Sequence, residues 1–277
     1  MRKLLYADIY QFLKNKIFWA EMAISAALAV FILIANYSKE VQVTSDAIRL
    51  EEIFFIFYQM VTVLIAAGIS LVVGTQYSDG TIRNKIVVGH TRGNIYFSTL
   101  TVCLLSSLAV IVIHTVFSYS IGCLLFGKFG VPISQILVSL LYIILNVMVL
   151  TAIFTACTMN IHNKAVSAVV AMLLALLLMY LAGTFIGILS EPEMIYENYV
   201  ISMDGIELGE MIKNPAYVSG TRRKVIEFLT DLSPVGQIIQ ICDEDFTRSD
   251  RWPFFSAALF AVVSLFGFLR FKKHDIK

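Results

Sequence analysis

Two short stretches carry residue types that could support catalysis, and each lacks a residue that the chemistry needs. Residues 122–128 fit the first seven positions of the phosphate-binding loop GxxxxGK[ST], but Phe129 stands where a hydroxyl would bind magnesium. Glu51 and Glu52 follow the order found in glutamate-based intramembrane proteases, but Ile56 stands where those enzymes carry arginine. The motifs HExxH and GxSxG do not occur in the sequence. We therefore expect no catalytic site in this chain.

The cysteines give no sign of a metal or redox site. The sequence has four of them: Cys103, Cys123, Cys157 and Cys242. None belongs to a CxxC pair, which is a common spacing for zinc binding or for redox work. We expect all four to be packing thiols, and we expect no metal site.

Six long apolar blocks dominate the sequence and must position any functional side chain. A helix needs roughly 20 apolar residues to cross the hydrocarbon core of a bilayer, and each block is about that long or longer. The composition agrees, since 58% of the residues are hydrophobic, 15% are charged and the mean hydropathy is +0.79. We therefore predict an all-α integral membrane protein with one transmembrane domain. The predicted spans are 17–35, 53–73, 96–126, 133–159, 165–189 and 253–271.

The distribution of charge predicts the orientation of these spans. Short basic loops stay on the cytoplasmic side, and an even number of spans places both termini on one side. The segments on the side of the termini carry twelve Lys and Arg against three Asp, whereas the other side carries nine cations against sixteen anions. We therefore predict a multi-pass protein of the cell membrane with both termini in the cytoplasm. The net charge of +1 gives no indication of a nucleic-acid partner.

Residues 1–16 form an amphipathic segment before the first span. Its apolar residues recur at helical spacing: Leu4, Leu5, Ile9, Phe12 and Leu13. Such a helix is expected to lie along the inner membrane surface in contact with lipid. The alternative is a simple cytoplasmic extension of the first span.

Polar side chains inside a membrane are costly, so each one invites a functional hypothesis. Glu21 lies about one turn inside the first span, where we expect a structural role. His114 and Asn146 lie nearer the middle of the third and fourth spans. They either line a translocation path or form hydrogen bonds between helices. Gly183 and Gly187 form a GxxxG stripe on the fifth span, which permits close helix approach within one subunit or between two.

The loop between the second and third spans is punctuated as a short, capped helix. Asp79 and Gly80 form a turn signal, and Thr81 can cap the start of a helix. Gly89 can end that helix, and Thr91 can cap the span that follows. The segment 79–92 is therefore predicted to hold a short cytoplasmic helix between two turns.

This short helix is expected to have an apolar face and a basic surround. Ile82, Ile86 and Val87 are expected to share the apolar face. The basic residues around the helix are Arg83, Lys85, His90 and Arg92. The alternative is a basic loop that anchors the topology and does nothing more.

The sequence of residues 76–85, QYSDGTIRNK, resembles the second intracellular segment of type 2 ABC exporter permeases. In that family a tyrosine, a glycine-threonine pair and an arginine-asparagine pair precede a glycine and an arginine, which match Gly89 and Arg92 here. The order of six spans, the amphipathic start and the large outer loop before the last span are similar as well. Gln76 departs from the pattern, because many members carry an acidic residue there, so the ion pair of that acid is not expected.

The resemblance implies a mechanism and a set of partners. The short helix would be a coupling helix that docks into a groove of a separate ATP-binding subunit, present in two copies that bind ATP and Mg. The chain itself would bind no cofactor and would pair with a second permease copy or a homologue. Hydrophobic or amphipathic cargo, such as antimicrobial peptides or drugs, would move outward. The residues carried over as the coupling interface are Asp79, Gly80, Thr81, Ile82, Arg83, Asn84, Lys85, His90 and Arg92.

Two other classes of function stay open. An ion-coupled secondary transporter or a channel would need no ATPase, and an intramembrane hydrolase would need a nucleophile with a base. Carriers driven by protons or sodium generally hold several buried carboxylates, whereas the spans here hold only Glu21. We therefore expect transport to draw its energy from a partner.

The outer stretch 190–252 is too long for a simple connection, with six cations and twelve anions among its residues. Its apolar part, residues 225–241, is interrupted by a serine-proline pair at 233–234. We predict two helices that dip into the outer leaflet as a re-entrant element, which is also similar to the permease family. The alternative is a small extracellular cap packed on itself.

Overall fold

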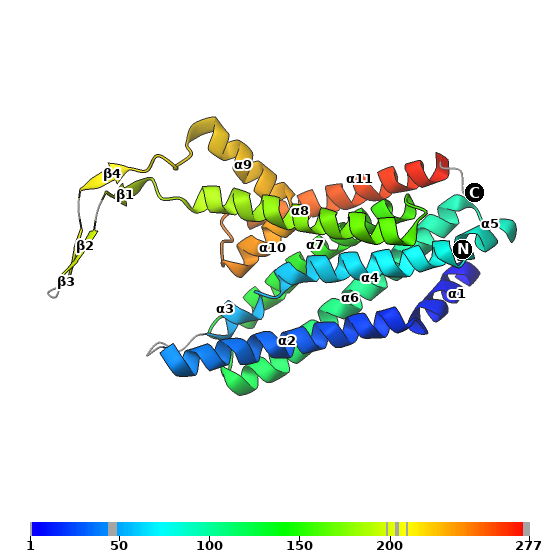
Figure 1. The fold of residues 1–277 in the computed structure, drawn as a ribbon, viewed down its shortest axis with the longest axis horizontal. Helices are drawn as coiled ribbons and strands as arrows, with labels where there is room; N and C mark the ends of the chain where they lie inside the picture. The colour runs from blue at the N-terminus through cyan, green and yellow to red at the C-terminus, as the bar shows by residue number, and fades with distance from the viewer. Residues whose placement is uncertain (1, 44–48, 198, 203–204, 209, 274–277) are drawn as a thin grey trace.

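The computed structural model describes residues 2–43, 49–197, 199–202, 205–208 and 210–273. Six long helices lie side by side in an elongated bundle (Figure 1). They are α2 (Lys16–Val43), α4 (Tyr58–Ser78), α6 (Arg92–Leu125), α7 (Ile133–Met159), α8 (Lys164–Ser190) and α11 (Trp252–Lys273). Among the described residues, six segments are long and apolar enough to cross a membrane, which confirms the predicted all-α membrane protein.

The second span was predicted as one continuous helix, but the structure has two helices there. Its first part forms α3 (Leu50–Phe54), and the helix breaks at residues 55–57 before α4 begins. The aromatic side chains around the break are buried: Phe54, Phe55, Phe57 and Tyr58. The carbonyl oxygen of Phe55 lies in the break and accepts a hydrogen bond from the Cys242 thiol at 3.0 Å. Cys242 therefore holds the break in place as well as packing, which the sequence did not indicate.

The amphipathic segment forms α1 (Arg2–Leu13), a helix separate from α2. Asn15 accepts a hydrogen bond from the backbone N–H of Ile17 at 2.9 Å and so caps α2. The buried side of α1 consists of Leu4, Asp8 and Phe12, and it packs against α6. A simple extension of the first span is therefore wrong, because the chain stops and restarts its helix at residues 14–15.

The bundle has a central and a peripheral set of helices. In the most apolar stretch of each span, 61% of the α3–α4 segment and 50% of α7 are buried, against 22% for α8 and for α11. The α4 helix contacts both α7 and α8, and α11 packs on α7. The outer surfaces of α8 and α11 are therefore left for lipid or for another chain.

We expect Gly267→Ala to destabilise the protein by about 1–3 kcal/mol. A Cβ at this position would lie 2.5 Å from the Cβ of Ala156 and 3.1 Å from its Cα, so α11 would have to move away from α7. Gly187→Ala is the matched control, because a Cβ there meets no atom within 4 Å and helical alanine is favoured by about 0.5–1 kcal/mol. Thermal unfolding in detergent compares the two variants. Equal effects would contradict the close α7–α11 contact.

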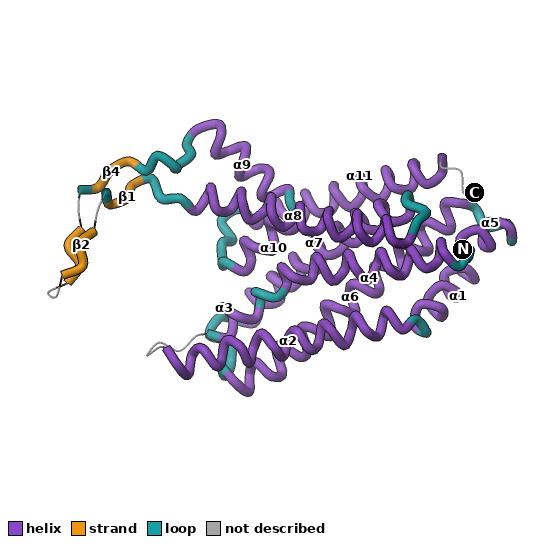
Figure 2. Tube along the Cα trace, viewed as in Figure 1, coloured by secondary structure: helices purple, strands orange, loops and turns teal. Residues whose placement is uncertain are grey.

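The outer stretch begins with a β-ribbon that the sequence analysis did not predict. Strand β1 (Met194–Tyr196) pairs with β4 (Met211–Lys213), and β2 (Tyr199–Ser202) pairs with β3 (Gly205–Leu208), both antiparallel. Figure 2 shows these strands projecting from one end of the bundle, which we call the ribbon end. An Asp-Gly pair in the sequence at 204–205 is typical of hairpins and could have indicated the ribbon.

The paired helices of the outer stretch are confirmed, with the break where it was predicted. Helix α9 (Gly220–Leu232) and α10 (Pro234–Cys242) meet at Ser233 with a bend of 94°. Pro234 cannot donate a hydrogen bond to α9, and the Ser233 hydroxyl accepts one from the α10 backbone at 3.2 Å. A short 3₁₀ helix, η1 (Ser249–Arg251), then leads into α11.

The α10 helix packs inside the bundle against three of the spans instead of packing on α9 alone. Its apolar side is fully buried against α4, α7 and α8: Val235, Ile238 and Ile241. Ser256 of α11 lies within hydrogen-bond distance of Gln237 on α10 at 3.3 Å and of Asn146 on α7 at 3.4 Å. Asn146 is at the centre of α7, so α10 has the placement that a re-entrant element needs.

Candidate functional site

The short helix of the 79–92 segment is present as α5 (Thr81–Val87), between α4 and α6. It lies at the end of the bundle where α1 begins and α11 ends, opposite the ribbon (Figure 1). We call this the α5 end. Two traverses of the bundle, by α2 and by α3–α4, lead from α1 to α5, so α5 lies at the same end as α1 and the last turn of α11, as the predicted topology requires.

The start of α5 differs from its prediction. Gly80 occupies the N-cap in the left-handed conformation, with φ of 67°, and no side chain caps the helix. The Gly80 carbonyl accepts the first helical hydrogen bond, from Asn84 at 2.9 Å. Thr81 is already the first helical residue, so its hydroxyl is not in the capping position, and the prediction of Thr81 as a cap is wrong. The glycine turn is favoured because a left-handed φ costs glycine little.

The end of α5 is confirmed as a glycine-terminated helix. Gly89 has φ of 97°, and its N–H donates to the Ile86 carbonyl at 2.9 Å. The next N–H, of His90, reaches back to the Lys85 carbonyl at 3.1 Å. This pair of bonds is the Schellman motif, which satisfies carbonyls at a helix end. Thr91 then caps α6 through its hydroxyl, as predicted. Both ends of α5 are therefore fixed by backbone geometry.

One side of α5 is anchored inside the protein by an ion pair. The Lys85 ammonium lies 2.8 Å from a carboxylate oxygen of Asp8 on α1, and both side chains are buried. Lys85 also donates to the Gln76 side chain at 3.2 Å, and the second Asp8 oxygen accepts from Ser98 of α6 at 2.6 Å. We call these four residues the Asp8 cluster. It joins α1, α4, α5 and α6 at the α5 end.

The anchored side corrects part of the predicted interface. Ile82 and Lys85 are buried, so they do not face a partner in this structure. The side-chain amide oxygen of Gln76 accepts a hydrogen bond from Lys85 on the same buried side. Asp8 was missed, although its spacing from Leu4 and Phe12 places it on the buried side of α1. That spacing was the available signal.

The opposite side of α5 is exposed and mixes polar with apolar groups. We call it the α5 outer face, and it consists of Asp79, Arg83, Asn84, Val87 and Val88. Val87 and Val88 are 79% and 77% exposed. The prediction that Val87 shares the buried face with Ile82 is therefore wrong. Adjacent exposed aliphatic side chains beside a cation and an amide are a composition typical of a docking surface.

Residues on both sides of α5 also contact other parts of the bundle, and they include the predicted interface residues His90 and Arg92. The Arg92 guanidinium donates to the Lys272 carbonyl at 3.0 Å, which ties the start of α6 to the end of α11. His90 is half-buried at the end of α5. The Tyr77 hydroxyl donates to the Met159 carbonyl, so the last turn of α4 is held against α7. The segments that flank α5 are therefore tied to α7 and to α11.

Glu21 is buried at a point where three helices meet. The Ser106 hydroxyl of α6 donates to its carboxylate at 3.4 Å. Gly68 of α4 leaves the room for it, since a Cβ there would lie 2.3 Å from a carboxylate oxygen. The structural role that the sequence indicated is consistent with this packing between α2, α4 and α6.

The other polar residues of the spans also contact neighbouring helices. His114 is buried, stacks on the Phe57 ring at a centroid distance of 4.0 Å, and lies 3.0 Å from the Ser118 hydroxyl. Asn146 accepts a hydrogen bond from the Ser256 hydroxyl of α11. Gly183 and Gly187 face outward, since a Cβ at either position would meet no described atom within 4 Å. Their stripe is therefore free to contact lipid or a second copy.

The near-motifs for catalysis have structural uses. A Glu51 carboxylate oxygen accepts from the Gly130 backbone at 3.1 Å and ties α3 to the loop after α6. Residues 122–125 lie in the last turn of α6, which is not the strand-to-helix setting of a phosphate loop. Within the described ranges, no group of three or more His, Cys, Asp or Glu side chains could hold a metal ion.

No protein-family model matches the chain, and no curated protein matches it. The six-span topology and the geometry of α5 are the features of this chain that bear on its function. Both are features of this chain itself, so each can be tested by substitution.

Proposed function

We propose that this chain is the membrane-spanning permease subunit of an ATP-driven exporter of the type 2 ABC class. It lies in the cell membrane with both termini and α5 in the cytoplasm. Two copies of a separate ATP-binding subunit bind ATP and Mg, and this chain has no ATPase site. A second permease copy or a homologue completes the path. The cargo is hydrophobic or amphipathic, such as an antimicrobial peptide or a drug.

The single observation that carries this proposal is the two-sided construction of α5. A seven-residue helix is fixed at both ends by glycine turns and anchored on one side by the Asp8 cluster, while its other side is exposed. A rigid element held in this way transmits displacement to the helices that it contacts. Docking of an ATP-binding subunit on the α5 outer face would therefore move α1, α4 and α6 together.

A second permease copy is supported by the sparse burial of the peripheral helices. The GxxxG stripe of Gly183 and Gly187 faces outward on α8, and small residues allow close packing between membrane helices. A bundle of six helices also encloses little space of its own. The proposed path therefore runs between two permease chains.

The proposal is tested by purifying the tagged chain in mild detergent from cells that produce it naturally and identifying the proteins that co-purify by mass spectrometry. The expected result is a complex of two permease chains with two ATP-binding subunits, which hydrolyses ATP and exports cargo. Purification of the chain alone, with gradient-driven transport in vesicles that contain no ATPase, would overturn it.

An ion-coupled carrier is the second candidate, and the burial of Glu21 is the observation that favours it. Under the ATP-driven mechanism, Glu21→Gln should leave transport within about twofold, because glutamine keeps the shape and a hydrogen bond to Ser106. Under ion coupling, the same change should abolish transport, since a buried carboxylate would carry the ion. Transport by the purified variant in vesicles, with and without an ion gradient, separates the two.

A further inference from the structure

A groove between α7 and α11 near the α5 end is not used by the proposed coupling mechanism. Its volume is about 320 Å³. Most of its lining is apolar, and it includes Ile153, Val263 and Phe266, with the Cys157 thiol in its wall. The surface of α11 beside it is exposed and apolar at Val262 and Leu265, so the groove opens where the protein would meet lipid.

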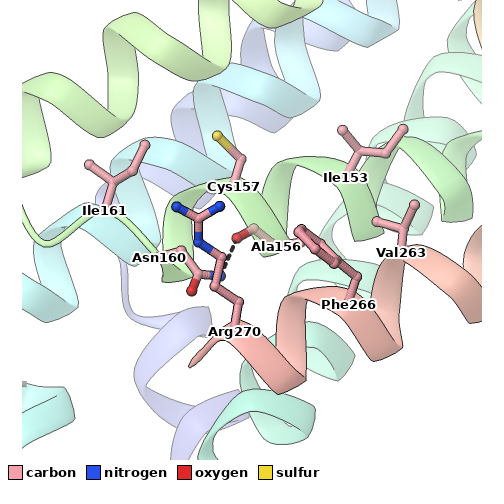
Figure 3. Close-up of a pocket in the computed structure, with 8 residues that line it drawn as sticks. All are labelled: Ile153, Ala156, Cys157, Asn160, Ile161, Val263, Phe266 and Arg270. Atoms are coloured by element: carbon pink, nitrogen blue, oxygen red, sulfur yellow. Dashed lines mark hydrogen bonds between the residues drawn. The ribbon is translucent and has the colours of Figure 1, made fainter. Parts of the chain in front are cut away.

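One end of this groove carries a cation. Figure 3 shows the Arg270 side chain reaching from α11 towards α7, with its guanidinium beside Cys157 and Asn160. Arg270 forms no ion pair with any residue in the part of the chain that the structure describes. Lys272 and Lys273 lie in the same last turn of α11 and add to the positive charge there. The apolar part of this groove is complementary to an acyl chain, and the cation at its end is complementary to an anionic headgroup.

We propose that this groove binds an anionic phospholipid from the leaflet at the α5 end. An acyl chain occupies the apolar part, and the phosphate group accepts hydrogen bonds from the Arg270 guanidinium. Guanidinium and phosphate form bidentate, charge-assisted hydrogen bonds, and basic pockets between spans on the cytoplasmic side are suited to such headgroups. A zwitterionic lipid offers the same acyl chain but carries an ammonium that opposes the cations.

The position of the groove gives the bound lipid a structural consequence. Asn160 on its wall donates to the Ala156 carbonyl at 2.7 Å and to the Gly267 carbonyl of α11 at 3.4 Å. The Lys272 carbonyl, two residues beyond Arg270, accepts the hydrogen bond from Arg92. A lipid held against this turn should therefore stabilise the α7–α11 contact and the start of α6.

The first test measures thermal unfolding of the full chain in detergent with added lipid. Phosphatidylglycerol should raise the unfolding temperature more than phosphatidylcholine with the same acyl chains, and glycerol phosphate, which has no chain, should have little effect. Arg270→Gln should weaken the phosphatidylglycerol effect about tenfold or more in lipid concentration, as loss of a charge-assisted bond implies. Lys273→Gln is the matched control, because it removes a cation from the same turn without lining the groove.

The second test reads occupancy of the groove directly and does not depend on stability. In a variant with Cys103→Ala, Cys123→Ser and Cys242→Ser, Cys157 is the remaining thiol for alkylation by a maleimide. Phosphatidylglycerol should slow its alkylation, and Arg270→Gln should abolish that protection, whereas Arg270→Lys should keep part of it. The proposal would be overturned if phosphatidylglycerol protected Cys157 from alkylation equally in Arg270→Gln and Lys273→Gln. It would also be overturned if the alkylation rate depended on protein concentration and not on lipid concentration.

Discussion

Arg83→Glu is expected to weaken binding of the ATP-binding subunit on the order of 100-fold while leaving the thermal stability of the chain unchanged. Arg83 is exposed on the α5 outer face and forms no ion pair with any described residue. The change therefore removes no ion pair within the described chain. Disruption of a docked charge pair costs about 2–5 kcal/mol, because the partner charge is left desolvated and unpaired. Titration of the ATP-binding subunit onto the chain in nanodiscs measures the Kd.

The control for this variant is Arg222→Glu. Arg222 is also exposed, but it belongs to α9 at the opposite end of the bundle. The Arg222→Glu variant should keep the Kd for the ATP-binding subunit within about twofold of the unmodified chain, because exposed charges at that distance are screened by salt. Similar losses in the two variants would indicate a general effect of net charge and contradict docking at α5.

Lys85→Ala is expected to destabilise the folded chain by about 3–5 kcal/mol. Among the described residues, the substitution leaves the buried Asp8 carboxylate with only the Ser98 hydroxyl as a partner. Removing one partner of a buried ion pair costs this amount. Asn84→Ala is the control, since Asn84 is the preceding residue and its side chain is exposed. Unfolding in a detergent series gives the free energies.

The double variant Asp8→Asn with Lys85→Met separates the pair from its neighbours. It should be less destabilised than the sum of its single changes, because neither residue then leaves a buried charge alone. Additive effects would show that the Asp8 cluster does not act as a unit. A loss below about 0.5 kcal/mol in Lys85→Ala, which is typical of surface changes, would show that the ion pair does not anchor α5.

Features that depend on residues close together in the sequence were predictable. The apolar blocks set the six spans, the Ser233–Pro234 pair set the bend between α9 and α10, and Gly89 set the end of α5. Each of these depends on hydrophobic length or on backbone geometry within a few residues. Local sequence therefore predicted the six spans, the bend between α9 and α10 and the end of α5, but not the β-ribbon or the break between α3 and α4.

Features that depend on distant contacts were not predictable in the same way. The direction of Lys85 is set by Asp8, which lies 77 residues earlier in the chain, and by the packing of α1 against α6. Val87 follows Ile82 by five residues, which is about 140° around an α-helix, so regular helix geometry itself turns Val87 away from the buried side that Ile82 and Lys85 share. The residues of the α5 segment were therefore predicted more accurately than which of them are exposed and which are buried.

The break between α3 and α4 shows the same limit. Residues 53–73 read as one apolar helix, and no proline or glycine marks residues 55–57. The break is supported by aromatic packing and by the Cys242 thiol, which reaches it from a distant part of the chain. Such support can be seen only in three dimensions.

The most direct measurement places a photo-crosslinking amino acid at Val88 on the α5 outer face in living cells. The expected product is a covalent adduct with the ATP-binding subunit, identified by mass spectrometry, which is lost when the probe is moved to Val262 on the exposed surface of α11. The account is contradicted if Val88 yields no such adduct, or if a cysteine at that position reacts with a membrane-impermeant reagent from outside intact cells.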